Sequence, residues 1–277
     1  MALPPARPNG AIPDAARVAA FAAARERVLA TIADACGRVG RDPADVALVA
    51  VSKTVTAERL VAAVAAGLTI LGENRVQEAE AKAAVVTGAT WHLVGPLQSN
   101  KARRALSTFA VIESVDSVGL AERLDRLAGE ERSGEERPRE ERHGEERPRE
   151  ERPREERPRE ERPRERVPVL LQVNVDRDPA KAGFMSDALV PALGLLAAFR
   201  HLEIRGLMTV GRLVDRAEEA RSTFAALRSL SERLRSGPGR GIVGPELSMG
   251  MSDDYAVAVE EGATIVRVGR ALFGERS

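Results

Sequence analysis

Lys53 is the residue of this chain whose position most clearly points to chemistry. Only Ser52 separates it from the apolar run Val46–Val51, and Thr56-Ala57-Glu58 then begins a predicted helix. A lysine amine condenses with an aldehyde to form an imine when the amine can lose its proton. Burial and a nearby cation such as Arg267 would favour the neutral amine. The alternative is a structural lysine that extends to solvent or pairs with Glu73.

Two glycine-containing turns near the C-terminus could bind a phosphate group. They lie in the segments Leu247–Gly262 and Val266–Gly274, each of which runs from a predicted strand into a predicted helix. Backbone N–H groups at a helix start attract anions. Ser248 and Ser252 would add hydroxyl donors, and Gly269 would let the backbone approach closely. Either turn alone could be only a tight connection between a strand and a helix. The two adjacent turns together indicate a phosphate site.

Other kinds of chemistry find less support. The three histidines are His92, His143 and His201, and neither they nor the carboxylates have metal-ligand spacing. We expect His92 to be a satisfied structural residue. A serine nucleophile would lack its G-x-S-x-G turn. Cys36 is the only cysteine, which excludes an intramolecular disulfide.

Composition gives no electrostatic reason to expect nucleic acid or membrane partners. The 277 residues include 42 basic and 42 acidic side chains, for a net charge of zero. No apolar run approaches the ~18 residues of a membrane span. The first residues lack the apolar core of a signal peptide, so we expect a cytoplasmic protein.

A repetitive tract interrupts the chain. Residues 130–166 contain 15 Glu and 13 Arg, mostly as EERPR pentads, which leaves 27 acidic and 29 basic residues in the other 240. Frequent proline opposes a helix, and nothing apolar offsets the entropy of ordering. We therefore expect a disordered insertion in a surface loop; the alternative is a charged interaction arm. Because it follows the predicted helix Leu120–Leu127, it should leave the barrel on the rim opposite the chemistry.

The rest of the chain alternates between strands and helices. Continuous apolar strands separated by helices indicate a parallel sheet covered on both faces. The predicted strands are Val46–Val51, Thr69–Gly72, Trp91–Gly95, Phe109–Ser114, Val167–Val175, Ile204–Val210, Pro245–Met249 and Thr264–Val268. The clearest predicted helices are Ala57–Ala66, Asp187–Phe199 and Ala217–Leu234.

Eight such units predict a single (β/α)8 TIM barrel, with a doubly wound sheet as the alternative. We expect residues 16–277 to form this one domain after a flexible N-terminus of residues 1–15, with Ala16–Val39 as an additional helix before the first strand. The polar residues Lys53, Asn74, Asn174, Ser248 and Arg267 all fall near the carboxyl ends of strands. In barrels of this type, that rim carries the functional groups.

Seven ordered motifs resemble a known family. AVSKTV, GENRVQE, WHLVGPLQSNK, ESVDS, RGLMTV, LSMGMSDD and VRVGRALFGER together look like the pyridoxal phosphate homeostasis proteins, the YggS/PROSC group. The resemblance runs from about Ala16 to Arg276 and is interrupted only by the pentads. It implies a barrel similar to the N-terminal domain of alanine racemase, which carries pyridoxal 5′-phosphate (PLP) as an imine.

The resemblance also implies roles for particular residues. Lys53 would be the Schiff-base lysine, Asn74 would lie beside the cofactor, and Met208 would line its pocket. The phosphate would be bound by Ser248, Met249 and Gly269. Arg267 would face the pyridine nitrogen and leave it unprotonated, which weakens the electron sink used in amino-acid chemistry. Arg270 stands where we expect threonine or serine, and it could reach the phosphate or point to solvent.

Two functions from different classes remain. The first is a PLP carrier without catalysis, which buffers the cofactor and passes it to PLP-dependent apoenzymes; the second is a racemase-like enzyme of fold type III. A two-base racemase needs a second acid/base group opposite the lysine. The chain stops at Ser277, and its only tyrosine, Tyr255, is predicted to lie in a helix. We therefore favour the carrier, expected as a monomer. A cofactor-free Schiff-base aldolase would not need the two phosphate turns.

Overall fold

The computed structural model describes residues 14–133, 166–212 and 214–274. Almost all of the expected flexible N-terminus and most of the pentad tract lie outside these ranges. Within them, no helix is long and apolar enough to cross a membrane.

Eight parallel strands form the centre of the fold, and each contains or overlaps a predicted strand. A further two-residue strand, β6 (Phe184–Met185), was not predicted; it pairs with the end of β5. The barrel strands are β1 (Ala47–Val51), β2 (Ile70–Glu73), β3 (Thr90–Leu93), β4 (Val111–Val115), β5 (Val167–Asn174), β7 (Leu202–Met208), β8 (Glu246–Ser248) and β9 (Ile265–Val268).

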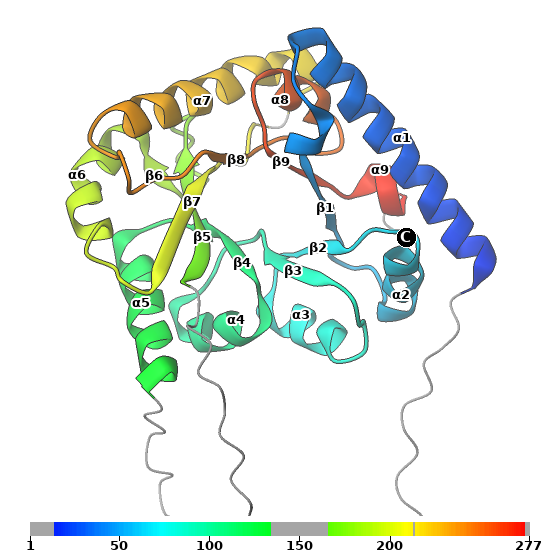
Figure 1. The fold of residues 1–277 in the computed structure, drawn as a ribbon, viewed down its shortest axis with the longest axis horizontal. Coiled ribbons are helices and arrows are strands. Elements are labelled where there is room, and N and C mark those ends of the chain that lie inside the picture. Colours follow the sequence, from blue (N-terminus) through cyan, green and yellow to red (C-terminus); the bar gives the residue numbers. More distant parts are fainter. Residues whose placement is uncertain (1–13, 134–165, 213, 275–277) are drawn as a thin grey trace, which may run out of the picture.

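The sheet closes on itself. Its strand order is β4-β3-β2-β1-β9-β8-β7-β5, and β4 also pairs with β5. All of these pairs are parallel, and the closing pair aligns Ile112 with Val169. The prediction of a single (β/α)8 barrel is therefore confirmed, and the doubly wound alternative is excluded. Figure 1 shows the strands as the inner ring, with the helices outside them.

The helices cover the outside of the barrel. Those predicted most clearly are present, although the last of them begins with a 3-10 turn at Ala217–Ala220. The α-helices are α1 (Ala15–Val39), α2 (Ala57–Ala65), α3 (Val76–Ala83), α4 (Ala102–Thr108), α5 (Val118–Ser133), α6 (Ser186–Leu196), α7 (Arg221–Ser236), α8 (Tyr255–Glu260) and α9 (Arg270–Phe273).

The additional N-terminal helix α1 is confirmed. The Asp14 side chain accepts a hydrogen bond from the Ala16 backbone N–H, and Gly40 ends the helix in the left-handed conformation. Its buried residues recur every three or four positions, as a helix with one apolar face requires. Figure 1 shows α1 on the outside of the barrel, and α1 contacts α2, α8 and α9, so it covers the side of the barrel where the first and last strand–helix units meet.

Two apolar clusters make the core. The larger one lies between the strands and the helices. The smaller one fills the barrel interior and consists of Val49, Val94, Leu170, Met208 and Ile265. Because side chains alternate along a strand, a single strand can supply both clusters, as β1 does with Val49 in the smaller one and Ala50 in the larger one. Because the barrel interior is packed, the polar residues at the two ends of the barrel are held in fixed positions.

The pentad tract is attached at the expected end of the barrel. It connects the C-terminal end of α5 to the N-terminal end of β5, which is the rim opposite the carboxyl ends of the strands. The first pentad residues belong to α5, and Glu130 bonds to Arg126 one turn earlier, at 2.6 Å.

Candidate functional site

Lys53 and the two glycine-containing turns lie at the same rim. β1 pairs directly with β9, with Ala50 aligned to Val268. β9 in turn pairs with β8. A Cβ atom placed on Gly269 would lie 3.4 Å from the carbonyl oxygen of Val51. The turn after β9 therefore lies against the end of β1, two residues before Lys53, as the sequence predicted.

The Lys53 side chain is half-buried and rises from a tight turn. The turn is closed by a hydrogen bond of 3.0 Å from the Val55 N–H to the Ser52 carbonyl. Within it, Thr54 adopts a left-handed conformation with φ of 68°. A β-branched residue rarely takes this conformation, which costs about 1–3 kcal/mol. The backbone is therefore strained at Thr54, directly after the predicted reactive lysine.

A buried ionic cluster lies behind this turn, and sequence reasoning missed it. The Lys82 ammonium on α3 donates to the Ser52 carbonyl oxygen at 2.9 Å, to Glu73 Oε1 at 2.6 Å and to Glu78 Oε1 at 2.7 Å. Glu73 is fully buried. Burial raises the pKa of Glu73, against the hydrogen bonds from Lys82 and Ser52 that lower it. The sequence signal was faint, because Lys82 occupies an ordinary polar position of a short helix.

A chain of hydrogen bonds crosses the barrel interior. Arg267 Nη1 donates to Ser248 Oγ at 2.5 Å, and Ser248 Oγ donates to Glu113 Oε2 at 2.5 Å. Glu113 Oε1 lies 2.7 Å from His92 Nδ1. Arg267 Nη2 also donates to the Thr209 carbonyl oxygen at 2.7 Å. All five residues are buried, so His92 is a satisfied structural residue, as predicted.

The charges in this chain compensate one another. Burial lowers the pKa of Arg267, opposed by the nearby carboxylates of Glu113 and Asp254. Burial alone would raise the pKa of Glu113, but the hydrogen bond and charge of His92 and the charge of Arg267 hold it below its ordinary value. A carboxylate therefore sits inside the barrel as the counter-charge of the buried guanidinium.

The turn after β8 is built around Gly250. Its φ is 89°, and an added Cβ would lie 2.5 Å from the Ala258 Cβ and 2.9 Å from the Tyr255 Cα. Glycine is therefore required there, both for the left-handed backbone and for space. Asp254 Oδ1 accepts from the Met251 N–H at 2.6 Å and closes the turn. The Ser252 hydroxyl accepts from the Gly269 N–H at 3.2 Å, which ties the two turns together.

The residues assigned to the phosphate divide into two groups. Ser248 and Met249 are buried: the Ser248 hydroxyl is held by Glu113 and Arg267, and the Met249 N–H donates to the Ile265 carbonyl. Gly269 and Arg270 lie nearer solvent at the start of α9. Arg270 is exposed and forms an ion pair with Asp253 of the preceding turn.

Asn74 and Met208 occupy different layers of the site. Asn74 follows β2 and is half-buried at the rim. The backbone of Asn74 passes so close to Gly95 that a Cβ there would lie 2.6 Å from the Asn74 Cα. Met208, by contrast, is fully buried in the barrel interior, at the end of β7. Met208 therefore belongs to the floor beneath the rim, and Asn74 to its wall.

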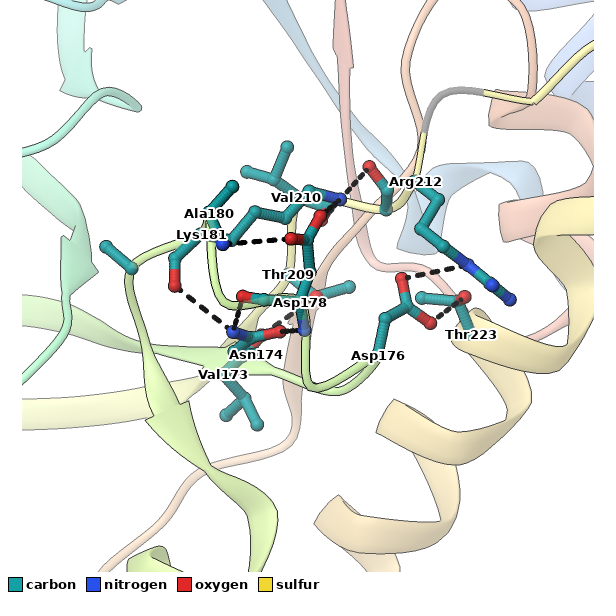
Figure 2. A network of polar contacts seen from close by, with 12 residues as sticks. Val173, Asn174, Asp176, Asp178, Ala180, Lys181, Thr209, Val210, Arg212 and Thr223 are labelled. Carbon is teal, nitrogen blue, oxygen red and sulfur yellow. Dashed lines mark hydrogen bonds and ion pairs between the residues drawn. The ribbon is translucent and has the colours of Figure 1, made fainter.

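Asn174 organises the loop that follows β5 (Figure 2). The Asn174 amide donates to the carbonyl oxygens of Asp178 at 2.7 Å and Lys181 at 3.1 Å, and it accepts from the Asp178 N–H at 3.0 Å. The Lys181 ammonium donates to the Gly211 carbonyl at 2.9 Å and points toward the segment after β7. Sequence reasoning did not single out this second amine at the rim.

The opposite mouth of the barrel holds a cavity of about 770 Å³. His92 lies in its wall, together with Arg205 and Glu246. None of the described residues that line it is a lysine. This cavity therefore offers no lysine amine to a cofactor among its described lining residues. Among the described residues there is also no group of histidine, cysteine or acidic side chains that could hold a metal ion.

Comparison with known proteins agrees with this architecture. Residues 29–277 match the family model "Alanine racemase, N-terminal domain". An alanine racemase from Clostridium difficile has a TM-score of 0.59 at 12% sequence identity, with 90% of this chain and 59% of that chain covered. At this identity the likeness shows a shared fold.

Other relatives are much more similar in sequence. A pyridoxal phosphate homeostasis protein of Pseudomonas aeruginosa is 36% identical over 252 residues, which cover 90% of this chain and 93% of that protein. A protein of the same name from Aquifex aeolicus is 32% identical, with 90% and 96% covered. The structure of PipY from Synechococcus elongatus with PLP bound is 39% identical and has a TM-score of 0.68, with 88% of this chain and 100% of that chain covered. The chain therefore belongs to the family of pyridoxal phosphate homeostasis proteins.

Proposed function

We propose that this protein binds pyridoxal 5′-phosphate through Lys53 and takes part in PLP homeostasis by buffering and delivering the cofactor, without catalysis. The observation that carries the proposal is the shared rim of the barrel. The end of β1, two residues before Lys53, lies against the turn after β9, which is linked to the turn after β8; both turns suit a phosphate. The names of the relatives and the PLP-bound PipY structure support the same ligand.

The residues present fit this cofactor. When bound, PLP supplies an aldehyde that condenses with an amine and releases water. Lys53 offers an amine at the rim. The first N–H groups of α9, those of Arg270 and Ala271, have no partner within the helix and can face an anion. Ser252 adds a hydroxyl next to them.

Arg267 would set the electronic character of the site. A guanidinium has only N–H donors, so a ring nitrogen that accepts from it stays unprotonated and withdraws electrons weakly. Arg267 is kept in place by Ser248 and by the Thr209 carbonyl. The proposed roles of Asn74 and Met208 are to flank the ring, and those of Met249 and Gly269 are to shape the backbone near the phosphate. The proposed role of Arg270 is to hold Asp253 away from that anion.

The racemase alternative gains no support from the site. A second base would have to face Lys53 across the cofactor. Tyr255 lies in α8, as expected, and Lys181 is engaged by backbone carbonyls. The similarity to alanine racemases is at the level of the fold. We further propose that the protein acts in the cytoplasm as a monomer and that PLP-dependent apoenzymes receive the cofactor.

Visible absorbance with borohydride trapping tests the function. The purified chain mixed with PLP should show a visible absorbance band that free PLP lacks, because the cofactor aldehyde condenses with a lysine amine. Reduction and peptide mapping should place the label on Lys53 rather than on Lys101 or Lys181. Lys53→Ala should abolish the band, and Lys101→Ala should retain it. Steady racemisation or decarboxylation of amino acids by the pure protein would refute the carrier function.

A further inference from the structure

Lys82 makes a complete set of hydrogen bonds in a buried place. It lies on α3, and its side chain is only 9% exposed. An ammonium has three N–H donors, and Lys82 has one acceptor for each: the Ser52 carbonyl, Glu73 Oε1 and Glu78 Oε1. The distances are 2.9, 2.6 and 2.7 Å. Its donors are therefore fully used by this one cluster.

Each acceptor of Lys82 also belongs to, or holds, the turn that carries Lys53. The Ser52 carbonyl is part of the peptide bond that joins Ser52 to Lys53. Glu73 Oε1 accepts a second hydrogen bond from the Ser52 hydroxyl at 2.7 Å. Glu78 Oε1 accepts a second one from the Thr54 N–H at 2.9 Å. The backbone is thus held at Ser52, before Lys53, and at Thr54, after it. The Lys82 ammonium bonds directly to Ser52 and reaches Thr54 through Glu78.

Stability alone is a poor explanation for this arrangement. A buried ion pair often stabilises the folded state no more than an apolar pair of the same size, because both charges lose their hydration on folding. The left-handed Thr54 is unfavourable as well. Two unfavourable features therefore meet at one turn of the chain. Such features persist where the surrounding structure imposes them, and they concentrate at functional sites.

We propose that Lys82 is a positioning residue for Lys53. Its ammonium, with Glu73 and Glu78, fixes the turn Ser52–Val55 so that the Lys53 amine is presented to the aldehyde of the cofactor. This inference rests on the proposed function, since it assigns a role within the same site. Lys82 itself does not touch the cofactor; it acts through the backbone.

Two variants test the inference, and PLP is the probe. Glu78→Ala removes the acceptor of the Thr54 N–H and leaves the buried Glu73–Lys82 pair intact, so the fold should survive. Lys82→Met removes the ammonium and fills its space with an apolar side chain. Both are studied at a temperature where circular dichroism shows the variant to be folded. Each should weaken PLP binding roughly tenfold, the factor that corresponds to losing one hydrogen bond to a charged group.

A second readout does not need the cofactor. In the cofactor-free protein, the Thr54 N–H should exchange with deuterium faster in both variants, because the turn opens more often. The double variant E78A/T54G should regain much of the binding lost in Glu78→Ala, since glycine adopts the left-handed conformation without strain. A lysine replacement elsewhere, Lys101→Met, should change neither binding nor exchange.

The outcomes separate the two proposals. If the unaltered protein forms no borohydride-stable adduct at Lys53, the proposed function fails. If it forms the adduct and folded Glu78→Ala binds PLP as tightly and as fast as the unaltered protein, the positioning role of the cluster is wrong. Glu78→Ala decides the matter even if Lys82→Met does not fold. Lower thermal stability with unchanged binding would show a purely structural cluster and would also overturn the inference.

Discussion

Arg267 and Glu113 are joined inside the barrel by one hydroxyl group, that of Ser248. The hydroxyl accepts from Arg267 and donates to Glu113, each at 2.5 Å. Opposite charges from β9 and β4, on different sides of the barrel, therefore compensate each other through a residue of β8. The proposed pyridine-facing cation consequently depends on a carboxylate at the far side of the interior.

Glu113→Gln should destabilise the protein strongly. The amide keeps the shape of the side chain but removes the larger of the two carboxylate charges near the buried Arg267 and leaves only that of Asp254, at a cost of about 3 kcal/mol. Urea unfolding at neutral pH would measure the change. Glu232→Gln, an exposed substitution on α7, serves as the control and should shift the unfolding free energy by less than about 0.5 kcal/mol. Equal stability of the two variants would show that Glu113 does not compensate Arg267.

Glu246→Gln should stabilise the protein at neutral pH but not at acidic pH. Burial raises the pKa of Glu246, aided by the charge of Glu113 and opposed by that of Arg205. The folded state therefore holds the proton more tightly than the unfolded state does. The carboxylate opposes folding above its folded pKa, and this effect disappears as the pH falls through that value.

Because Glu246 is only partly buried, the expected gain is small, about 0.5 kcal/mol. Thermal unfolding at pH 7 and at pH 4 would show a gain at the first pH and little at the second. Glu122→Gln, on the exposed side of α5, should give no difference at either pH. A gain that persists at low pH would indicate a cause other than this ionisation.

Gly250→Ala should distort the turn that follows β8. The new Cβ would overlap Ala258 and Tyr255, in addition to the strain of a left-handed backbone. We expect a loss of about 2–4 kcal/mol from overpacking and strain together. Gly241→Ala is a matched control, because Gly241 has a φ of 77° but nothing within 4 Å of the new Cβ.

Denaturant unfolding of the two glycine variants would separate the contributions. Gly241→Ala should show the strain alone, about 1 kcal/mol. PLP affinity, measured by absorbance, should fall in Gly250→Ala and stay unchanged in Gly241→Ala. Normal PLP binding by Gly250→Ala would show that the turn after β8 is not part of the proposed phosphate site.

Deletion of residues 134–165, replaced by a short Gly/Ser linker, should leave PLP binding unchanged. The segment joins α5 to β5 at the rim opposite Lys53, and the deletion keeps all of α5. The absorbance band and the borohydride adduct provide the comparison with the full chain. Loss of the adduct in a folded deletion variant would contradict the assignment of the two rims.

The sequence was sufficient to predict the barrel, and the reason is physical. Parallel strands buried on both faces appear as continuous apolar runs, and Val46–Val51 or Thr264–Val268 are easily found by that rule. The two-residue β6 is too short to leave such a pattern. At the site, the order of the strands was enough to place the end of β1, two residues before Lys53, against Gly269, because strands one and eight of a closed barrel must be neighbours.

The polar networks could not be predicted in the same way. Ser248 and Arg267 were assigned by resemblance, but their partner Glu113 is 135 positions from Ser248 in the chain. Lys82 is nine positions from Glu73, a spacing that a helix preceded by a turn does not fix. Which side chain bonds to which depends on how strands from different parts of the chain face one another across the barrel, and local patterns do not contain that information.

The attachment of the pentad tract has an implication for how this chain can change. The connection between α5 and β5 opens on the end of the molecule that faces away from the proposed vitamin-binding residues. A short block of codons can therefore be duplicated there and lengthen the polypeptide without affecting ligand binding. Selection for binding would not remove such an insertion. The same junction would accept a fluorescent or affinity module, giving a reporter whose signal leaves the bound vitamin undisturbed.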